Sequence, residues 1–455
     1  MMHWTAAAAP ALDTGNTAWV MVSAALVLLM TPGLAFFYGG MVRAKSVLNM
    51  LMMNVICMAV VGVLWIAYGY AAVFGGAHAG GLIGWDASLL GLGTTQSLLT
   101  SVNGAGVPIV VVAAFQLMFA IIAPALMSGA IADRTRFWGW TMFVALWVTV
   151  VYLPVANWVF GSGWILNTLH AEDFAGGTAI HINAGAGALA LALVVGKRTG
   201  WRRDPMKPHN VPLVLLGAAL LWFGWYGFNA GSAGAANGTA GLSFTTTTAA
   251  TCAAVLGWLL VEQLRDGRPT TIGAASGAVA GLVAITPGCA FVSPWGAMAI
   301  GVIAGALCAW AVGLKYRFGF DDSLDVVGVH LVGGLAGTLL IGVFGFGSDS
   351  SQAGLLYGGG PALLGKQAVA ALVVLGYSFV VSLVLALVVK KIHGFRVSEQ
   401  AELGGIDEHE HAETAYSFTG GLGARFAMAS AVEAEHALPA DQRPTPQSRH
   451  TRRDA

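Results

Sequence analysis

The sequence predicts an all-α polytopic membrane protein with eleven transmembrane helices, and its charge pattern is the first reason. Only 10% of the 455 residues are charged, whereas 56% are hydrophobic and 62 are glycine. A soluble protein usually carries about 25% charged residues. No charged residue occurs between Arg136 and Glu172, or between Lys207 and Glu262. Both intervals exceed the ~20 apolar residues that cross a bilayer, so each contains at least one span.

Apolar segments between charged or turn-forming residues define the eleven predicted spans. The segments 48–74 and 364–390 are long enough to tilt, and Pro287 and Pro294 mark a tight turn between the short eighth span and the ninth. The outer loop at about 75–106 is nearly uncharged and is expected to fold back as a cap. In chain order, the predicted spans cover residues 17–39, 48–74, 107–131, 137–159, 177–196, 212–233, 242–263, 271–290, 295–314, 325–346 and 364–390.

The distribution of basic residues supports the count of eleven and predicts the orientation. With the N-terminus outside, only Lys366 among the 22 lysines and arginines lies on the outer side of the predicted spans. All the others lie in inner loops or in the C-terminal tail. The positive-inside rule predicts this asymmetry for an N-out, C-in protein, and one span more or fewer would remove it.

The composition changes abruptly after Arg396. We therefore expect a membrane domain over residues 1–396, a polar and acidic cytoplasmic segment over 397–418, and a tail over 419–455 that is predicted to be disordered. The N-terminus has no basic region before an apolar core, so no signal peptide is predicted. The four cysteines lie in apolar stretches without CxxC or CxxH spacing, which favours small core residues over a disulfide or metal framework.

The fifth and tenth predicted spans share a pattern. DFAGGTAIHINAGAGALA and DVVGVHLVGGLAGTLL each begin with an aspartate, Asp173 or Asp325, and continue through a histidine, His181 or His330, into small residues. Because the fifth span enters from outside and the tenth from inside, the repeat is inverted. Inverted repeats bring matching helices together near the bilayer midplane, and small residues let their backbones approach closely. We therefore predict an inverted repeat of helices 1–5 and 6–10, followed by a long eleventh helix.

An ionisable side chain inside a span is costly and is a functional candidate by default. His181 and His330 are the two clearest cases. A single buried histidine is as often a core residue bonded to a carbonyl, but a matched pair on related helices favours function. Burial favours neutral imidazoles, and two neutral rings in contact still offer a donor and an acceptor to a small polar solute. Haem or zinc would need room or ligands that the neighbouring sequence lacks, so no metal or cofactor is predicted.

Aromatic and polar side chains recur at helical spacing on the third and sixth predicted spans. Ring faces attract a partly dehydrated cation by about 0.5–2 kcal/mol each, and a hydroxyl accepts hydrogen bonds from its N–H groups. Single aromatic residues more often serve packing or the membrane interface, but glycines beside the second group favour a site. The residues concerned are Phe115, Gln116 and Phe119 on the third span, and Trp225, Phe228, Asn229 and Ser232 on the sixth.

Four motifs together resemble the ammonium transporter (Amt/Rh) family, of the bacterial Amt type, over about residues 15–418: DFAGGTAIHINAG, WFGWYGFNAGSAGAAN, GLVAITPGCA and DDSLDVVGVHLVGG. The resemblance implies ammonium uptake across the plasma membrane, the inner membrane of a bacterium, by a homotrimer with one pore through each subunit. Methylammonium would serve as a substrate analogue. No nucleophile–base set or cofactor fingerprint indicates an enzyme, and a net charge of zero indicates no nucleic-acid partner.

The resemblance also assigns roles to individual residues. Ammonium would lose water and a proton at an outer recruitment site, pass a pair of stacked gate rings, and cross the pore as ammonia beside the two histidines. Phe160 stands where many members have a second tryptophan, which weakens the outer site, and Asp173 also fits the role of a helix N-cap. By motif position, the recruitment site would be formed by Phe119, Phe160, Trp225 and Ser232, and the gate by Phe115 and Phe228. The pore histidines would be His181 and His330. Structural or pore-lining roles would fall to Gln116, Asp173, Asn229 and Thr286.

The segment 397–418 resembles the family's cytoplasmic regulatory segment, which docks on the helical bundle and responds to a PII-class nitrogen-regulatory protein. Its acidic run, Asp407 to His411, is expected to be solvated rather than to bind metal. Two other functions stay open: an ammonium sensor that signals through this cytoplasmic tail, and an Rh-like channel for ammonia or carbon dioxide. The aromatic outer site favours an ammonium transporter over the channel, and the sequence shows no output domain of the kind a sensor would use.

Overall fold

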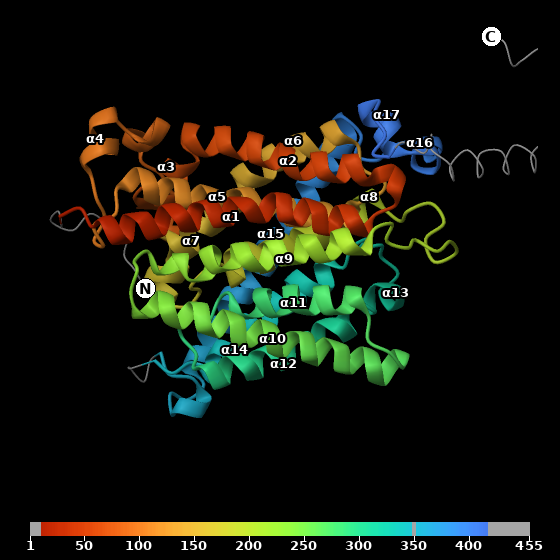
Figure 1. Cartoon of the computed structure of the whole chain (residues 1–455). Coiled ribbons are helices and arrows are strands. Elements are labelled where there is room, and N and C mark those ends of the chain that lie inside the picture. The colour runs from red at the N-terminus through yellow and green to blue at the C-terminus, as the bar shows by residue number, and fades with distance from the viewer. Residues whose placement is uncertain (1–10, 348–351, 417–455) are drawn as a thin grey trace, which may run out of the picture. The chain divides into compact units, whose positions relative to one another are not determined.

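The computed structural model describes residues 11–347 and 352–416 of the chain, and the predicted tail at 419–455 lies outside the described residues. Met1–Ala412 belong to one compact unit. The described residues of this unit are mostly helical, as predicted, and Figure 1 shows the long helices running side by side.

Ten helices in the described part of the chain are long and apolar enough to cross a membrane. They correspond to ten of the eleven predicted spans. The remaining one, the eighth predicted span, is the shorter helix α11 (Thr271–Ile285). Because α11 has only 15 residues, we propose, and do not observe, that it crosses the membrane. The elements of the ten long helices are α1 (Thr14–Met41); η1 (Ala44–Ser46), α2 (Val47–Leu64), η2 (Trp65–Gly69) and α3 (Tyr70–Phe74); α5 (Ile109–Met127) and η5 (Ser128–Ile131); α6 (Phe137–Trp147), η6 (Val148–Tyr152), α7 (Leu153–Phe160) and η7 (Ile165–Leu169); η8 (Gly177–Ile182) and α8 (Asn183–Val195); α9 (Val211–Asn229) and η9 (Gly231–Ala233); α10 (Gly238–Asp266); α12 (Pro294–Ala311) and α13 (Leu314–Phe318); η10 (Val327–Leu331) and α14 (Val332–Phe344); and α15 (Ala362–Ile392).

Side-chain caps determine where several of these helices begin. The first turn of a helix leaves backbone N–H groups unpaired, and a capping oxygen accepts a hydrogen bond from one of them. In five helices the cap accepts from the N–H three residues further on, so the start of the helix is encoded locally. These caps are Asp13 for α1, Asn210 for α9, Asn237 for α10, Thr270 for α11 and Ser293 for α12.

The loop at 75–106 folds back on the helix ends, as the sequence suggested. It contains the strands β1 (Ala77–His78) and β2 (Ile83–Gly84) and the short helices η3 (Ala79–Gly81), η4 (Ala87–Leu92) and α4 (Thr95–Thr100). Trp158 donates to the carbonyl of Leu82 at 2.8 Å, which ties the loop to α7. Figure 1 shows α4 at the opposite end of the helices from α16 (Glu399–Gly404) and α17 (Ile406–His411).

The fifth and tenth spans approach each other closely at glycines. A Cβ atom at Gly185 would lie 2.5 Å from the backbone nitrogen of Leu331, and one at Gly334 would lie 3.0 Å from the Cβ of His181. Each of these two spans also begins with a π-helical turn, η8 or η10, that contains its histidine. Other π turns occur at η2, η6 and η7, so a π turn by itself does not distinguish these two spans. What they share is that the turn stands at the start of the span and contains the histidine.

The segment after Arg396 lies against the helix ends. Asp407 accepts hydrogen bonds of 2.8 and 3.0 Å from two N–H groups in the first turn of α2, and Glu410 accepts one of 3.0 Å from the first N–H of α6. Asp407 is only 3% exposed, and burial raises the pKa of its carboxyl. The expectation of a fully solvated acidic run is therefore wrong, because these carboxylates pair with the unpaired N–H groups and dipoles of two helices.

Candidate functional site

His181 and His330 lie together in the interior of the bundle, where η8 and η10 bring them into contact. Their Nδ1 atoms are 3.3 Å apart, and their ring centroids are 5.4 Å apart with 18° between the ring planes. Both side chains are buried. The structure thus contains the meeting of the two histidines that the repeat predicted, and neither ring faces the outside of the bundle.

A direct bond between the two Nδ1 atoms constrains the hydrogens of the pair. One Nδ1 donates and the other accepts, and a neutral imidazole has a single N–H group, so the accepting ring carries its hydrogen on Nε2 and the donating ring has a bare Nε2. The pair therefore still offers one donor and one acceptor. Nε2 of His181 is buried without a hydrogen-bond partner among the described residues, so it is available to a small polar molecule.

A chain of ring contacts leads away from the histidine pair through four residues, Phe115, Phe119, Trp225 and Phe228, which we call the ring cluster. His181 stacks on Trp225 at 5.5 Å between centroids and on Phe228 at 6.1 Å. Phe228 contacts Phe119 at 4.4 Å, and Phe119 meets Phe115 edge-on at 4.9 Å. The ring of α5 that contacts Phe228 is therefore Phe119 and not Phe115 as expected, because the Phe115 ring lies beside Gly231, where an added Cβ would be 3.1 Å from its Cε2.

Trp225 is held in place by a hydrogen bond from its indole nitrogen. Nε1 donates to Oγ1 of Thr286 at 2.8 Å, and this hydroxyl donates to the carbonyl of Leu282 at 2.7 Å. Both residues are buried. Since a buried indole N–H needs an acceptor, Thr286 positions the Trp225 ring beside His181. The predicted proximity of Thr286 to Trp225 is thus present in the structure.

The other predicted site residues differ in their relation to this cluster. Ser232 is half-buried and donates to the carbonyl of Phe228 at 2.7 Å, which leaves its oxygen free to accept. Asn229 donates to Thr247 at 2.9 Å and so ties α9 to α10. Gln116 is buried on α5. Phe160, half-buried at the end of α7, makes no ring contact with the cluster in the described part of the chain.

Asp173 organises the turn that carries His181. Its two carboxylate oxygens accept hydrogen bonds of 2.7 Å from the backbone nitrogens of Gly176, Gly177 and Thr178, and a further bond from the Thr178 hydroxyl. Asp173 is 3% exposed. Gly176 is the N-cap residue of η8, so Asp173 is not the cap itself, but its carboxylate accepts from the first N–H groups of the turn and so positions the turn that carries His181.

Replacing Asp173 with asparagine is expected to lower the stability by about 2 kcal/mol, since hydrogen bonds to a charged group are worth about 1.5–3 kcal/mol and the amide keeps one acceptor oxygen. Transport should fall as well, because η8 would no longer hold His181. Thermal unfolding and methylammonium uptake would measure the two effects. Asp13→Asn is the matched control, since Asp13 is an exposed cap and asparagine caps almost equally well. An unchanged uptake in Asp173→Asn would contradict this role.

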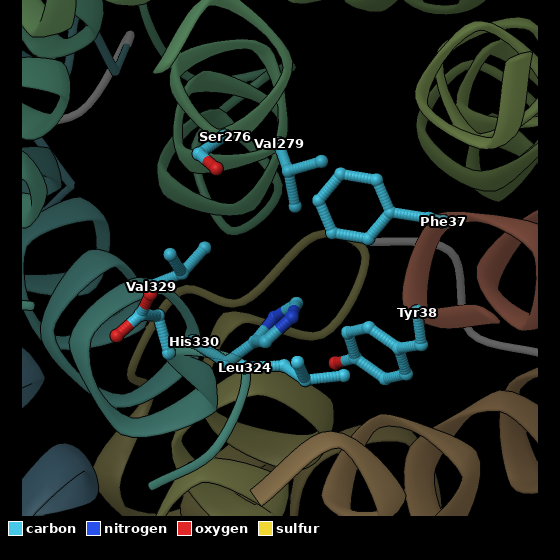
Figure 2. A pocket seen from close by; sticks show the side chains of 8 residues that line it. Phe37, Tyr38, Ser276, Val279, Leu324, Val329 and His330 are labelled. Carbon is cyan, nitrogen blue, oxygen red and sulfur yellow. The ribbon is translucent and has the colours of Figure 1, made fainter. Parts of the chain in front are cut away.

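A small cavity of about 10 Å³ lies next to His330, and Figure 2 shows the side chains that line it. Phe37, Tyr38, Ser276 and Val329 are among the residues that line it, and the His330 ring faces the same space. This volume is close to the minimum for one water-sized molecule. Phe37, Tyr38 and Ser276 were not predictable as site residues, because an aromatic pair on the first span and one serine on a short helix look like packing residues in the sequence.

Comparisons with known proteins indicate the family of this chain. A family model described as the Ammonium Transporter Family matches residues 18–416. An "Ammonium transporter" of Mycobacterium tuberculosis is 58% identical over 434 residues, which cover 89% of this chain and 91% of that protein. The chain belongs to the ammonium transporter family. It is therefore a multi-pass protein of the plasma membrane that transports ammonium, and not an enzyme.

Solved structures place the helices in the fold of this family. The crystal structure of Saccharomyces cerevisiae Mep2 matches with a TM-score of 0.78 and 34% identity, covering 85% of this chain and 88% of that chain. A structure described as "Sensor Amt Protein" matches with a TM-score of 0.80 and 30% identity, covering 87% of this chain and 98% of that chain. The fold is thus common to transporters and to a protein named as a sensor.

Proposed function

We propose that this ammonium transporter recruits ammonium at an aromatic outer site, where the ammonium gives up a proton to water, and conducts ammonia through an apolar tunnel past His181 and His330. The observation that carries the proposal is the buried imidazole pair, whose Nδ1 atoms are 3.3 Å apart at the end of the ring cluster. An enclosed pair with one free donor and one free acceptor suits a small uncharged molecule. In a bacterium the direction is uptake across the inner membrane.

The recruitment step is assigned to Phe119, Phe160, Trp225 and Ser232. Ring faces attract a cation that has shed part of its water, and the Ser232 oxygen accepts a hydrogen bond from its N–H groups. The contact between Phe119 and Phe228 supports a gate made of these two rings, with Phe115 behind Phe119. Ammonia passes when the rings move apart.

The cost of a bare cation explains the selectivity. No carboxylate belongs to the ring cluster or the histidine pair, and transfer of an ion from water to such a site costs several kcal/mol even after relaxation. Neutral ammonia avoids most of this cost. Potassium has no proton to lose, so deprotonation, rather than diameter, separates ammonium from potassium.

The proposal is tested with the full chain reconstituted in liposomes. Currents on a solid-supported membrane are recorded after jumps of ammonium, methylammonium and potassium, together with uptake of labelled methylammonium. Ammonium and methylammonium should be transported and potassium should not, with protein-free liposomes as the control. Potassium transport equal to that of ammonium would overturn the mechanism.

Thr286→Val is expected to weaken the outer part of the pathway. The change leaves the Trp225 N–H without its acceptor in a buried site, which costs about 1–3 kcal/mol, so the indole should shift and uptake of methylammonium should fall. Kinetics of uptake and the thermal midpoint measure the effect. Thr245→Val is the control, because Thr245 is exposed and, among the described residues, its hydroxyl bonds only to the carbonyl of Gly241 in its own helix. Equal uptake in both variants would contradict the positioning role of Thr286.

We also propose that the protein is a homotrimer with a pore through each subunit. Large apolar side chains on the outer surface support contact with lipid or with further copies, among them Phe223 on α9, Leu256 on α10 and Trp295 on α12. The mass of the detergent-solubilised particle tests the assembly. A particle with the mass of one subunit would exclude the trimer.

The segment 397–418 is proposed to regulate transport and to respond to a PII-class protein. Its described part touches several helix ends at once: Glu402 is fully buried and accepts a bond of 2.7 Å from the backbone nitrogen of Thr199. A partner that displaces the segment would therefore release contacts to α2, α6 and the chain after α8. Deleting residues 397–455 should abolish binding of the PII protein to membranes that contain the transporter, and retained binding would exclude this partner site.

A second candidate function is ammonium sensing through the cytoplasmic tail. The likeness to the structure described as "Sensor Amt Protein" and the docked segment both favour it. The same liposome experiment distinguishes the two functions. A sensor would bind ammonium while conducting little, whereas a transporter gives sustained methylammonium uptake.

A further inference from the structure

A second cavity, of about 190 Å³, lies away from the histidine pair among α8, α12, α13 and the start of the tenth span. No residue of the ring cluster lines it. Its walls are mainly apolar, and Leu189, Leu314, Phe318 and Val332 are among the lining residues. Phe318 is 70% exposed, so the cavity reaches the surface of the bundle.

The charged residues that line this cavity, Lys315 and Asp322, are satisfied by protein groups. Lys315 donates to the carboxylate of Asp325 at 2.6 Å and to the carbonyl of Asp322 at 2.9 Å. The Asp322 carboxylate accepts from the backbone nitrogens of Val326 and Val327. A polar occupant would find these groups already bonded and would lose its bonds to water, so an apolar chain is the occupant that fits.

A basic aromatic cluster, formed by Lys197, Trp201, Arg202 and Tyr316, adjoins the cavity. The rings of Trp201 and Tyr316 are stacked at 5.9 Å with 13° between their planes. Lys197 Nζ and the Arg202 guanidinium carbon lie 4.9 and 5.7 Å from the centroid of the Trp201 ring. Tyr316 belongs to α13, which lines the cavity, and Lys197 Nζ lies 3.9 Å from the position of a Cβ at Gly319, directly after α13.

The charges of this cluster are available to an anion. Lys197 and Arg202 are exposed, and neither forms an ion pair with a carboxylate of the described residues. Trp310, on the helix before α13, and Phe318 are also largely exposed, so apolar surface surrounds the opening of the cavity. Tryptophan and tyrosine gather where the bilayer meets water, and the positive-inside rule places this cluster at the cytoplasmic leaflet.

We propose that the cavity and the basic aromatic cluster together bind one anionic phospholipid of the cytoplasmic leaflet. An acyl chain occupies the cavity, the phosphate contacts Lys197 and Arg202, and Trp201 and Tyr316 lie at the level of the headgroup. Basic groups beside a crevice between transmembrane helices recognise anionic headgroups in this way. Neither histidine and no residue of the ring cluster lines the cavity, so the lipid site does not depend on the proposed mechanism.

The test uses the full chain in liposomes that contain phosphatidylglycerol with a photoreactive diazirine in one acyl chain. After irradiation, cross-links should concentrate in peptides that contain Leu189, Leu314 or Val332. Phosphatidylcholine with the same acyl chain should label these peptides about tenfold less, because its headgroup has no net charge to pair with two cations. Equal labelling by both probes would overturn the preference for an anionic lipid.

Matched variants test the two halves of the site. Replacing Lys197 and Arg202 with glutamine should reduce phosphatidylglycerol labelling to the phosphatidylcholine level, whereas the same change at the exposed Arg268 and Lys391 should leave it unchanged. Val332→Phe tests the cavity. The larger side chain should fill it and so reduce labelling by both the phosphatidylglycerol and the phosphatidylcholine probe. If that variant does not fold, the charge variants still decide, since unchanged labelling of the double glutamine variant contradicts the site. Excess inorganic phosphate should not compete, and competition would assign the cluster to a free anion instead.

Discussion

Replacing His330 with glutamate is expected to admit potassium and to lower the ratio of ammonium to potassium transport by about tenfold or more, which corresponds to about 1.4 kcal/mol. The histidine pair lies among buried aromatic rings that carry no charge. A carboxylate there supplies the counter-charge that a dehydrated cation otherwise lacks, and it offsets part of the desolvation cost. Uptake of labelled methylammonium and the current after a potassium jump, measured on the same liposomes, give the ratio, because neutral ammonia itself carries no current.

His181→Glu should act in the same direction, because its Nδ1 bonds that of His330 and its Nε2 has no other partner among the described residues. His78→Glu is the control, since His78 is exposed in the loop at 75–106, away from the histidine pair and the ring cluster. Its ratio should equal that of the wild type. If both pore variants kept wild-type selectivity, the assignment of the two histidines to the pathway would be wrong.

The histidine pair was predictable because it is encoded twice. Each histidine follows an aspartate into a run of small residues, so the sequence showed both the symmetry and the close approach, and the glycine contacts at Gly185 and Gly334 agree. The partner of Phe228 was not predictable in this way. Phe115 and Phe119 are one turn apart on α5, and only the position of that helix relative to α9 decides which ring makes the contact.

The spans were predictable because apolar length and basic loops are local properties of the sequence. The docking of the acidic segment was not predictable, because its partners are distant in the sequence. Asp407 caps α2 and Glu410 caps α6, and both helix starts lie more than 250 residues earlier in the chain. A run of acidic residues with two histidines is typical of a solvated segment. Only the positions of two helix N-termini, set by the whole bundle, make it a docking element.

The buried arginine at the same end of the bundle leads to the second prediction of large effect. Arg134 is completely buried, and its guanidinium donates five hydrogen bonds, to the carbonyls of Ala130, Ala132, Gly196 and Asp321 and to the Ser323 hydroxyl. These bonds join the chain after α5 to the end of α8 and to the segment before η10. Burial lowers the pKa of Arg134 to about 10, so the group stays charged at neutral pH.

Arg134→Met is expected to destabilise the protein by about 3–5 kcal/mol, because several buried carbonyl groups and a hydroxyl lose their donor at once, although the ion-pair partner of Arg134 keeps a second arginine. Asp321 is the partner, with Arg198 on its other side at 2.9 Å. Arg134→Lys should also be severe, since an ammonium has three donors in place of the five that the guanidinium uses here. The thermal midpoint of the purified protein measures both variants. A shift within experimental error in Arg134→Lys would show that the charge alone, and not the set of hydrogen bonds, holds this end together.

Arg265→Met is the matched control, because Arg265 pairs with Asp266 on the surface, where both side chains are 47% exposed. Exposed pairs contribute about 0–1 kcal/mol, so this variant should stay close to the wild type. The acid dependence should separate the two sites further. Burial alone would raise the pKa of Asp321, but the hydrogen bonds and charges of Arg198 and Arg134 lower it below its ordinary value. The contribution of Asp321 to the free energy of unfolding is therefore complete above its pKa in the unfolded chain, about 3.9, and is lost as the pH falls through its lower pKa in the folded protein. Acid should therefore bring the stability of the wild type toward that of Arg134→Met.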